Sequence, residues 1–510
     1  MYLALYCVSI VPLLCPKSES ERVTFFREQL LFSTPRYYPY NTTLPALHCA
    51  LTKPKRPRRS RNKFPTSART MFNQIILILT LALVTLVAQT HAIEPIVIIP
   101  GLAATVLDAT QVDATSHFLC SSNRPTPYRI WFSLTESVEK VLCLIENTRL
   151  QYDTQTNCTV QGRHGSTIFA HGWGNTTGVE ALNPTGPSGA RVPMFKDMVT
   201  TLVNDHGYER GVSIRAAPYD FRLWGDACYS KDLMSRIQVL ITKTYAMNNN
   251  SAVRLICHSM GCAITHKMLL QMNAEWKEKY LVGLVALAAP FAGAPSSLYT
   301  IVTGDMSGIP LSFQRSVSTW TSIASLIPHE MQHLGTPIYG KDTVVLQTPK
   351  QDYTIANIVE LVRDLATNGY YHTQFPKAMH GRARLPDGDK IWKYIQTTLF
   401  NASAHPGVVL DTVYVSDVPT PSKYIYTKDD LSDSGGGTIV YGYKGDGTVP
   451  VNSVEIPSQA WNKEPHGKKV TLHPLPSQPK NHMNHMNSQH MGTCWHPMAI
   501  KIVVQLVTGK

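Results

Sequence analysis

The stretch Ala252-Val-Arg-Leu-Ile-Cys-His-Ser-Met-Gly-Cys262 decides the fold class of this chain. Its first half is apolar and ends at the small residue Cys257, and Ser259 follows directly before a run of helix-forming residues. This pattern is typical of a nucleophile elbow, in which a serine lies on a tight turn between a strand and a helix. Cys257 stands where the pattern usually has glycine, and its side chain is small and apolar. In the alternative interpretation, Ser259 only caps the helix that follows.

Short apolar segments alternate with longer helical stretches on both sides of this motif, which predicts a parallel sheet covered by helices. The expected strands are Ile96–Ile99, Val212–Ile214, Val253–Cys257, Leu281–Ala288, Val408–Val415 and Thr438–Tyr443. The expected helices are Met194–His206, Lys231–Met247, Gly261–Glu278 and Pro497–Thr508. Residues from Tyr299 to about Thr354 break this rhythm and are interpreted as an insertion or lid. We therefore predict an α/β-hydrolase fold, with a mostly parallel central sheet, helices on both of its faces, and cap or lid insertions.

The chain has 510 residues and a formal net charge of +12, but this charge is unevenly distributed. Residues 1–70 hold 12 Lys and Arg against 3 Asp and Glu, whereas residues 71–510 hold 35 against 32. We interpret residues 1–70 as a disordered basic extension. Because the remainder is nearly neutral, the composition argues against a nucleic-acid-binding protein.

An apolar run follows Met71 and is closed by small residues near Ala92. A run of this length is typical of a secretory signal peptide and is short for a membrane span. Residues 71–92 are therefore predicted to be a signal peptide, with Met71 as the functional start and an N-terminal membrane anchor as the alternative. Residues 93–510 would be the folded domain, and the expected location is the secretory pathway, either secreted or lysosomal or vacuolar.

Seven cysteines in the folded part agree with that route, as do four Asn-x-Ser/Thr glycosylation motifs at Asn157, Asn175, Asn249 and Asn401. The sequence has no CxxC pair and no Cys/His spacing typical of zinc, so we expect no metal ion and no cofactor. An odd number of cysteines leaves at least one thiol without an intramolecular partner. Cys257 and Cys262 are predicted to be buried small hydrophobic residues.

A nucleophilic serine needs a base that takes its proton and a carboxylate that orients the base. Asp446 is the acid candidate, because it follows a predicted strand and has glycine on both sides. The alternative is an Asp-Gly turn with no further role. The base should lie further along the chain, in a tail rich in histidine. We favour His490, a few residues before the last helix, over His485 and then His482.

The reaction also needs two backbone N–H groups that stabilise negative charge on the substrate oxygen. One should come from Met260, the residue after the serine. The other should come from Leu102, in the loop after the first strand, where Gly101 allows the backbone to approach closely. The alternative for this loop is a plain turn that ends the strand.

Together these segments resemble the lecithin:cholesterol acyltransferase family, which includes lysosomal phospholipase A and phospholipid:diacylglycerol acyltransferases. The matching blocks are, in order, Ile98–Leu102, Arg215–Leu223, His258–Gly261, Leu287–Gly293, Val418–Pro421, Gly445–Val449 and the ending from His490 to Gly509. The family's last block runs from the catalytic histidine to a terminal glycine, which favours His490. By this similarity, Ser259, Asp446 and His490 would be nucleophile, orienting acid and base.

The resemblance also implies features outside this triad. Cys120 and Cys143 would form a disulfide that closes a small membrane-binding loop, residues 120–143. Within it, Trp131 and Phe132 would contact lipid, and a buried aromatic cluster is the alternative for these rings. Residues 303–350 would match the lid, and a second family disulfide is not evident in the sequence.

The implied reaction takes a fatty acyl group from a glycerophospholipid through an acyl-enzyme and passes it to water or to an alcohol, such as a sterol or another lipid. The expected partners are phospholipid membranes or lipoprotein surfaces and a lipid acyl acceptor, and the sequence does not identify a protein partner. Two alternatives remain: a neutral lipase or esterase of the same fold, and a catalytically inactive lipid-binding homologue.

Overall fold

The computed structural model describes residues 93–509 except 116–119, 133–140, 149, 154, 157, 184–191, 304–324, 329–331, 334–335, 338, 359, 362–403, 428–436, 466 and 479–487. The predicted basic extension and the predicted signal peptide or anchor lie outside the described residues. The same is true of His482 and His485, and of the glycosylation motif asparagines Asn157 and Asn401. No helix in the described part is long and apolar enough to cross a membrane.

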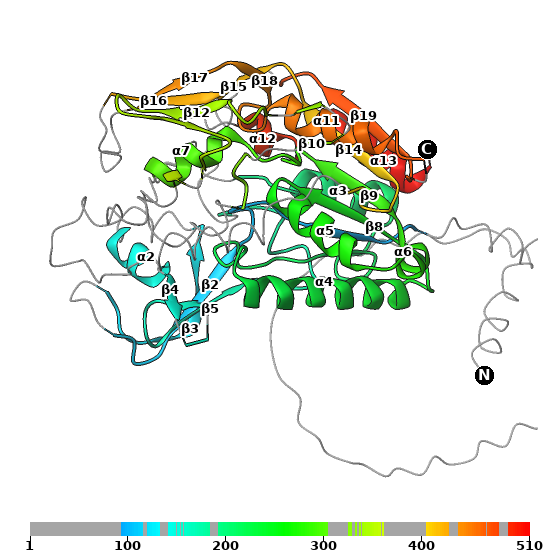
Figure 1. Ribbon diagram of the computed structural model, residues 1–510. Coiled ribbons are helices and arrows are strands. Elements are labelled where there is room, and N and C mark those ends of the chain that lie inside the picture. Colours follow the sequence, from blue (N-terminus) through cyan, green and yellow to red (C-terminus); the bar gives the residue numbers. More distant parts are fainter. Residues whose placement is uncertain are drawn as a thin grey trace, which may run out of the picture. The chain divides into compact units, whose positions relative to one another are not determined.

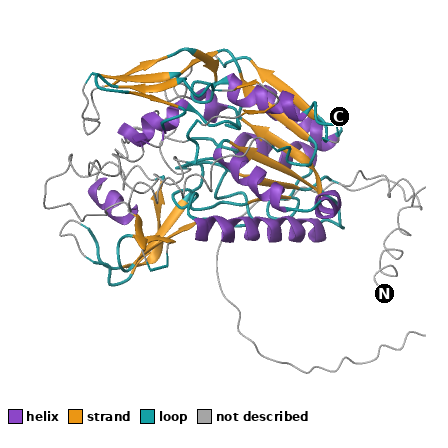
Figure 2. Ribbon diagram, in the orientation of Figure 1, coloured by secondary structure: helices purple, strands orange, loops and turns teal. Residues whose placement is uncertain are grey.

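Six parallel strands of the described chain form the central sheet (Figures 1 and 2). Their order is β19 (Val470–Leu475), β14 (Leu410–Val415), β9 (Leu281–Leu287), β8 (Val253–His258), β1 (Ile96–Ile99) and β7 (Ile214–Ala216). The strands β1 and β8 are buried along their whole length, as expected for parallel strands covered on both sides. The predicted parallel sheet is therefore confirmed, and the serine motif follows one of its inner strands. The predicted strand Thr438–Tyr443 is wrong in its place: it is divided between β17 (Gly437–Val440) and β18 (Tyr443–Gly445), outside this sheet, and β19 was not predicted.

Helices cover this sheet in two groups. In the first, α3 (Lys196–His206) contacts α13 (Pro497–Thr508). In the second, α4 (Ala227–Met247), α5 (Met260–Gln271) and α6 (Ala274–Tyr280) lie together, and α4 and α5 contact β1 and β8. A further helix, α11 (Val451–Trp461), contacts β14 and β19. The α/β architecture predicted from the alternating pattern is thus observed.

One predicted helix is wrong in its extent. The stretch Gly261–Glu278 was expected to be continuous, but it forms α5 and α6 with a break between them. Met272 has an extended backbone, with φ −90° and ψ 138°. The Asn273 side chain then accepts a hydrogen bond from the Trp276 N–H and begins α6. A side-chain cap of this kind starts a new helix and competes with continuation of the preceding one.

Smaller sheets lie outside the central sheet; one of them is mixed and the others are antiparallel. The first comprises β3 (Arg124–Trp131), β2 (Leu107–Gln111) and β6 (Ser166–Ala170), beside the hairpin of β4 (Leu150–Asp153) and β5 (Cys158–Gln161) and the helix α2 (Val141–Thr148). The second comprises β13 (Asp352–Thr354), β12 (Val344–Gln347), β16 (Lys423–Tyr426) and β17 (Gly437–Val440), near α7 (Pro295–Thr303). A pair of short strands, β10 (Gln332–His333) and β11 (Thr336–Pro337), lies between α7 and β12 in the sequence.

The stretch interpreted as an insertion or lid is only partly described. Its beginning belongs to α7, and its end forms β12 and β13 of the second small sheet. Most of residues 304–338 lies outside the described residues. Where it is described, this region forms structure separate from the central sheet, and its action as a lid stays a prediction.

Candidate active site

Ser259 lies on a sharp turn between β8 and α5. Its φ of 50° and ψ of −125° are unusual for a residue with a side chain, and its N–H donates to the Leu287 carbonyl over 3.0 Å. Gly261 makes the turn possible, because a Cβ at this position would lie only 2.5 Å from the Ile99 carbonyl oxygen and closer still to that of Pro100. The turn therefore has the geometry of a nucleophile elbow, which exposes the serine hydroxyl at the end of a strand.

His490 lies in the short helix α12 (Ser488–Gly492), 231 residues along the chain from Ser259. Its Nε2 lies 2.8 Å from Ser259 Oγ, and its Nδ1 lies 2.7 Å from Asp446 Oδ2. A carboxylate only accepts hydrogen bonds, so Nδ1 carries the hydrogen and Nε2 is free to accept the serine proton. The structure thus brings together the three side chains that the sequence analysis selected.

Asp446 is held by its own loop. Its Oδ1 accepts hydrogen bonds from the N–H groups of Thr448 and Val449, over 2.9 and 2.7 Å, which leaves Oδ2 for His490. The loop follows β18 (Tyr443–Gly445), and β18 pairs with β15 (Val418–Thr420). The family-like block Val418–Pro421 therefore anchors the strand that carries the acid.

All three side chains are buried or nearly so. Charge–charge and charge–dipole interactions are stronger away from water. A proton that moves from Ser259 to His490 would therefore leave an imidazolium well stabilised by Asp446. This arrangement can deprotonate the serine and hold the resulting charge.

The loop after β1 lies against the elbow. A Cβ built on Gly101 would be 2.9 Å from Ser259 Cβ, so the backbone before Leu102 passes directly beside the serine. Met260 is the first residue of α5, and the N–H groups of a first helical turn have no partner within the helix. Both backbones that were predicted to supply oxyanion donors thus flank Ser259, and their role as donors stays a proposal.

The membrane-contact prediction for Trp131 and Phe132 is wrong. Both side chains are buried, with exposed fractions of 2% and 6%. The Trp131 indole N–H donates to the Ala103 carbonyl over 2.8 Å, and its ring packs edge-on against Phe221. These rings form the buried aromatic cluster that was the alternative, and Trp131 supports the loop that carries Leu102.

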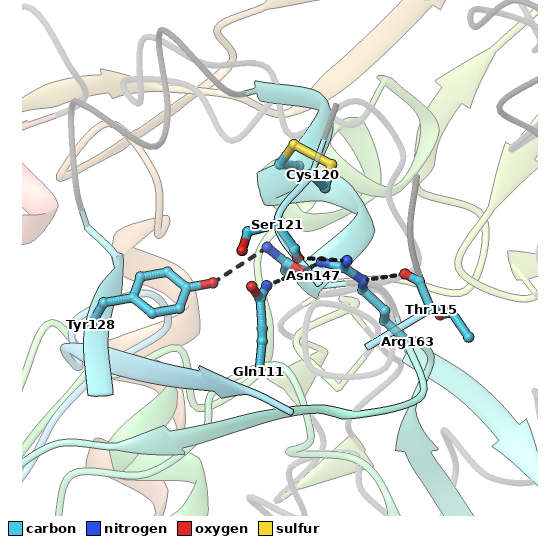
Figure 3. The surroundings of a disulfide bond; sticks show 8 residues. Gln111, Thr115, Cys120, Ser121, Tyr128, Asn147 and Arg163 are labelled. Atoms are coloured by element: carbon cyan, nitrogen blue, oxygen red, sulfur yellow. Dashed lines mark hydrogen bonds between the residues drawn. A yellow bond between two sulfur atoms is a disulfide. The ribbon is translucent and has the colours of Figure 1, made fainter. Parts of the chain in front are cut away.

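The disulfide between Cys120 and Cys143 is present, and a polar cluster fixes its surroundings (Figure 3). Arg163 is buried and donates to the carbonyls of Thr115 and Ser121, over 2.9 Å each, and to the Asn147 side chain. These contacts link Ser121, at the start of the predicted loop, to Asn147, just beyond its end, through one side chain in the turn between β5 and β6. The segment 133–140 in its middle lies outside the described residues.

Two further disulfides went unrecognised in the sequence. Cys158 bonds to Cys228, and Cys257 bonds to Cys262. The last two were expected to be buried small hydrophobic residues; they are buried, but they form a bridge across the elbow. Cys494 is a buried free thiol, and burial raises its pKa.

His258 is a residue near the reaction centre that the sequence analysis did not select. It directly precedes Ser259, and its Nε2 lies 3.1 Å from the carbonyl oxygen of His490. Burial, and then the electrostatic interaction with His490, lowers the pKa of His258 to about 3, so this ring is neutral near neutral pH. The signal in the sequence was its position inside the elbow, but only the fold reveals its partner. Within the described part of the chain, no group of three His, Cys, Asp or Glu side chains could hold a metal ion.

The chain is similar to one protein family and to several known proteins. Residues 127–493 match the family model described as lecithin:cholesterol acyltransferase. Lysosomal phospholipase A and acyltransferase of Rattus norvegicus is 30% identical over 411 residues, which cover 79% of this chain and 89% of the rat protein. Phosphatidylcholine-sterol acyltransferase of Oryctolagus cuniculus is 27% identical over 395 residues, 77% of this chain and 81% of the rabbit protein. Among solved structures, the Tle4–Tli4 complex aligns with a TM-score of 0.45 and 14% identity, over 81% of this chain and 99% of that one.

Proposed function

Since this chain belongs to the lecithin:cholesterol acyltransferase family, we propose that it takes a fatty acyl group from a glycerophospholipid onto Ser259 and passes it to an alcohol or to water. The family and the relatives support an acyltransferase and phospholipase of this type. The observation that carries the serine mechanism is the hydrogen-bonded row Ser259–His490–Asp446 at the end of β8. It joins three segments that are far apart in the sequence.

The first half of the proposed reaction is acylation of the serine. His490 Nε2 takes the proton of Ser259 Oγ while the oxygen attacks the ester carbonyl carbon of the phospholipid. The N–H groups of Leu102 and Met260 then stabilise the oxyanion, each by roughly 3 kcal/mol. The ester C–O bond breaks, and His490 gives its proton to the departing lysophospholipid oxygen.

The second half repeats these steps with a new nucleophile. Water or the hydroxyl group of a sterol or other lipid gives its proton to His490 and attacks the acyl-enzyme. The Ser259 ester bond breaks, and the proton returns to Oγ. Water gives a free fatty acid, and an alcohol gives a new ester, so the identity of the acceptor sets whether the enzyme acts as phospholipase or acyltransferase.

We further propose that the substrate is met at a phospholipid membrane or lipoprotein surface, because a two-chain lipid is scarcely soluble in water. The three disulfides fit a protein of the secretory pathway, where oxidising conditions maintain such bonds. We propose that the mature protein is secreted or delivered to lysosomes or vacuoles, and localisation of the full chain in cells tests this.

The test uses the full chain, purified beside Ser259→Ala and the matched control Ser235→Ala, which changes an exposed serine on α4. Each is incubated with vesicles of labelled phosphatidylcholine, with and without sterol, and in parallel with labelled triacylglycerol and a simple ester. We expect release or transfer of label with the original chain and with Ser235→Ala, and none above background with Ser259→Ala. Turnover by Ser259→Ala at the original rate would refute the serine mechanism. Release by the original chain only from triacylglycerol or simple esters would instead favour a neutral lipase.

A further inference from the structure

His258 is linked to both of the residues between which the proton is proposed to move, Ser259 and His490. It is joined to Ser259 by the chain and to His490 by a hydrogen bond between Nε2 and the main-chain carbonyl, 3.1 Å long. The side chain is only 2% exposed. A carbonyl oxygen only accepts, so Nε2 is the protonated nitrogen of the ring.

The other nitrogen of this ring has no hydrogen-bond partner among the described residues, although it is buried. It faces the loop after β1, since a Cβ on Gly101 would lie 2.7 Å from Nδ1. On its remaining sides, the ring lies 5.0 Å from the His490 ring and packs edge-on against Phe195 at 6.4 Å, measured between centroids. The imidazole is thus fixed in one tautomer and one orientation between the elbow, the Gly101 loop and α12.

The hydrogen bond from His258 is important for the backbone of His490, because the neighbouring backbone N–H groups donate to other carbonyls. The N–H groups of Thr493, Cys494 and Trp495 donate to the carbonyls of Gln489, Met491 and Gly492. The carbonyl of His490 is left to His258. Since α12 has only five residues, contacts with other segments fix its position. The Gln489 side chain exchanges hydrogen bonds with the backbone of Gln478, and His258 supplies the donor to the carbonyl of His490 itself.

We infer that His258 is a positioning residue that sets the distance between nucleophile and base, by donating from Nε2 to the His490 carbonyl while its own backbone leads into Ser259. This inference rests on the proposed function. A shift of about 1 Å between reacting groups can cost about a hundredfold in rate. The contact between His490 Nε2 and Ser259 Oγ, at 2.8 Å, is the one that His258 maintains.

The test compares two substitutions at this position in the full chain. His258→Leu keeps the approximate size but removes the donor, whereas His258→Gln keeps an N–H donor that can reach the same carbonyl. The matched control is His266→Leu, because His266 is also buried and its Nε2 lies 2.8 Å from a carbonyl oxygen, that of Ala404, away from the reaction centre. Melting temperature, kcat and KM on phosphatidylcholine vesicles, and the rate of labelling by a fluorophosphonate probe are measured for each.

We expect His258→Leu to lower kcat and the labelling rate by about tenfold to a hundredfold, with KM changed by less than about twofold. His258→Gln should recover most of this loss, and His266→Leu should retain the original kcat per folded molecule even where its melting temperature falls equally. The inference is overturned if His258→Leu and His266→Leu have the same kcat, or if glutamine restores nothing. Failure of the proposed function is a separate result, because it would appear as activity in Ser259→Ala.

Discussion

At the scale of single residues, position 261 has no room for a side chain. The carbonyl oxygens of Ile99 and Pro100 lie where a Cβ would be placed, and both belong to the backbone of β1 and its loop. Neither can move without shifting the Leu102 loop. Ser259, two residues earlier, has a positive φ, so the same turn combines an unfavourable serine conformation with a position that tolerates no side chain.

We predict that Gly261→Ala lowers the free energy of unfolding by about 1–3 kcal/mol, the usual range for overpacking, and reduces activity more than the unfolded fraction explains. Gly340→Ala is the matched control, since its nearest neighbour would be a flexible side chain at 3.6 Å. Denaturant unfolding and activity on phosphatidylcholine vesicles check both. A Gly261→Ala protein with unchanged stability and activity would show that the elbow is looser than described.

Residues such as Ser259 and Asp446 could be selected from the sequence because turn chemistry is local: small neighbours and glycines mark where a backbone bends sharply. His490 was harder to choose, since the tail holds several histidines, and only the family-like ending from His490 to Gly509 favoured it over His485 and His482. Trp131 was misjudged because an aromatic cluster has the same composition whether it faces lipid or the core. His258 was missed because its partner is 232 residues away.

At the scale of elements, the strand β8 and the helix α5 are joined twice: by the turn at Ser259 and by the disulfide between Cys257 and Cys262, five residues apart. Both cysteines are fully buried. The bridge therefore closes a small ring of chain around the proposed nucleophile. Its effect should be to limit the conformations open to this segment when the protein unfolds.

We predict that replacing both cysteines by alanine lowers the free energy of unfolding by about 2 kcal/mol, which is the chain-entropy value for so short a loop. Cys494→Ala is the control for loss of buried volume, since that cysteine is buried and unbridged. Chemical denaturation measures both effects. In a peptide map made without reductant, the peptide that contains Cys257 and Cys262 should also be lighter by two hydrogen atoms than the same peptide after reduction. Complete alkylation of both thiols in unreduced, denatured protein would contradict the bridge.

The inner strands β8 and β9 could be predicted because each is a buried apolar run followed by a helix, whereas β19, at the edge of the sheet, is mostly half-buried and was not predicted. Helix ends were less accurate, and α5 and α6 were merged because both have helix-forming residues and only Asn273 marks the break. The pair Cys120 and Cys143 was expected from the family resemblance, but the other two disulfide pairs were not, since pairing depends on distance in the fold. Cys158 and Cys228, for example, are 70 residues apart.

At the scale of the whole molecule, buried neutral histidines link stability to pH. Burial lowers the pKa of His258 to about 3 and that of His266 to about 4, and it also lowers the pKa of His405 and His496. In the unfolded chain these groups would titrate near 6.5. Below that pH the unfolded chain therefore binds more protons than the folded one, which favours unfolding.

We predict that the melting temperature falls as the pH is lowered from about 6.5 towards about 4, with a loss on the order of a few kcal/mol. Burial raises the pKa of Glu94, which opposes this trend, but only at one site. His266→Leu should show a shallower fall than the original chain, because one of the responsible groups is removed. Thermal unfolding measured across this pH range tests the prediction. A melting temperature that stays constant or rises as the pH is lowered would be inconsistent with neutral buried histidines.

The measurement that tests the central claim most directly is rapid quenching of the full chain during turnover of phosphatidylcholine, followed by mass spectrometry of its peptides. The account predicts a fatty acyl ester on the peptide that contains Ser259, formed within the first turnover and lost as product appears. An acyl group on a different residue would contradict the account. Steady turnover without any acylated peptide would also contradict it, provided that a serine ester is shown to survive the quench.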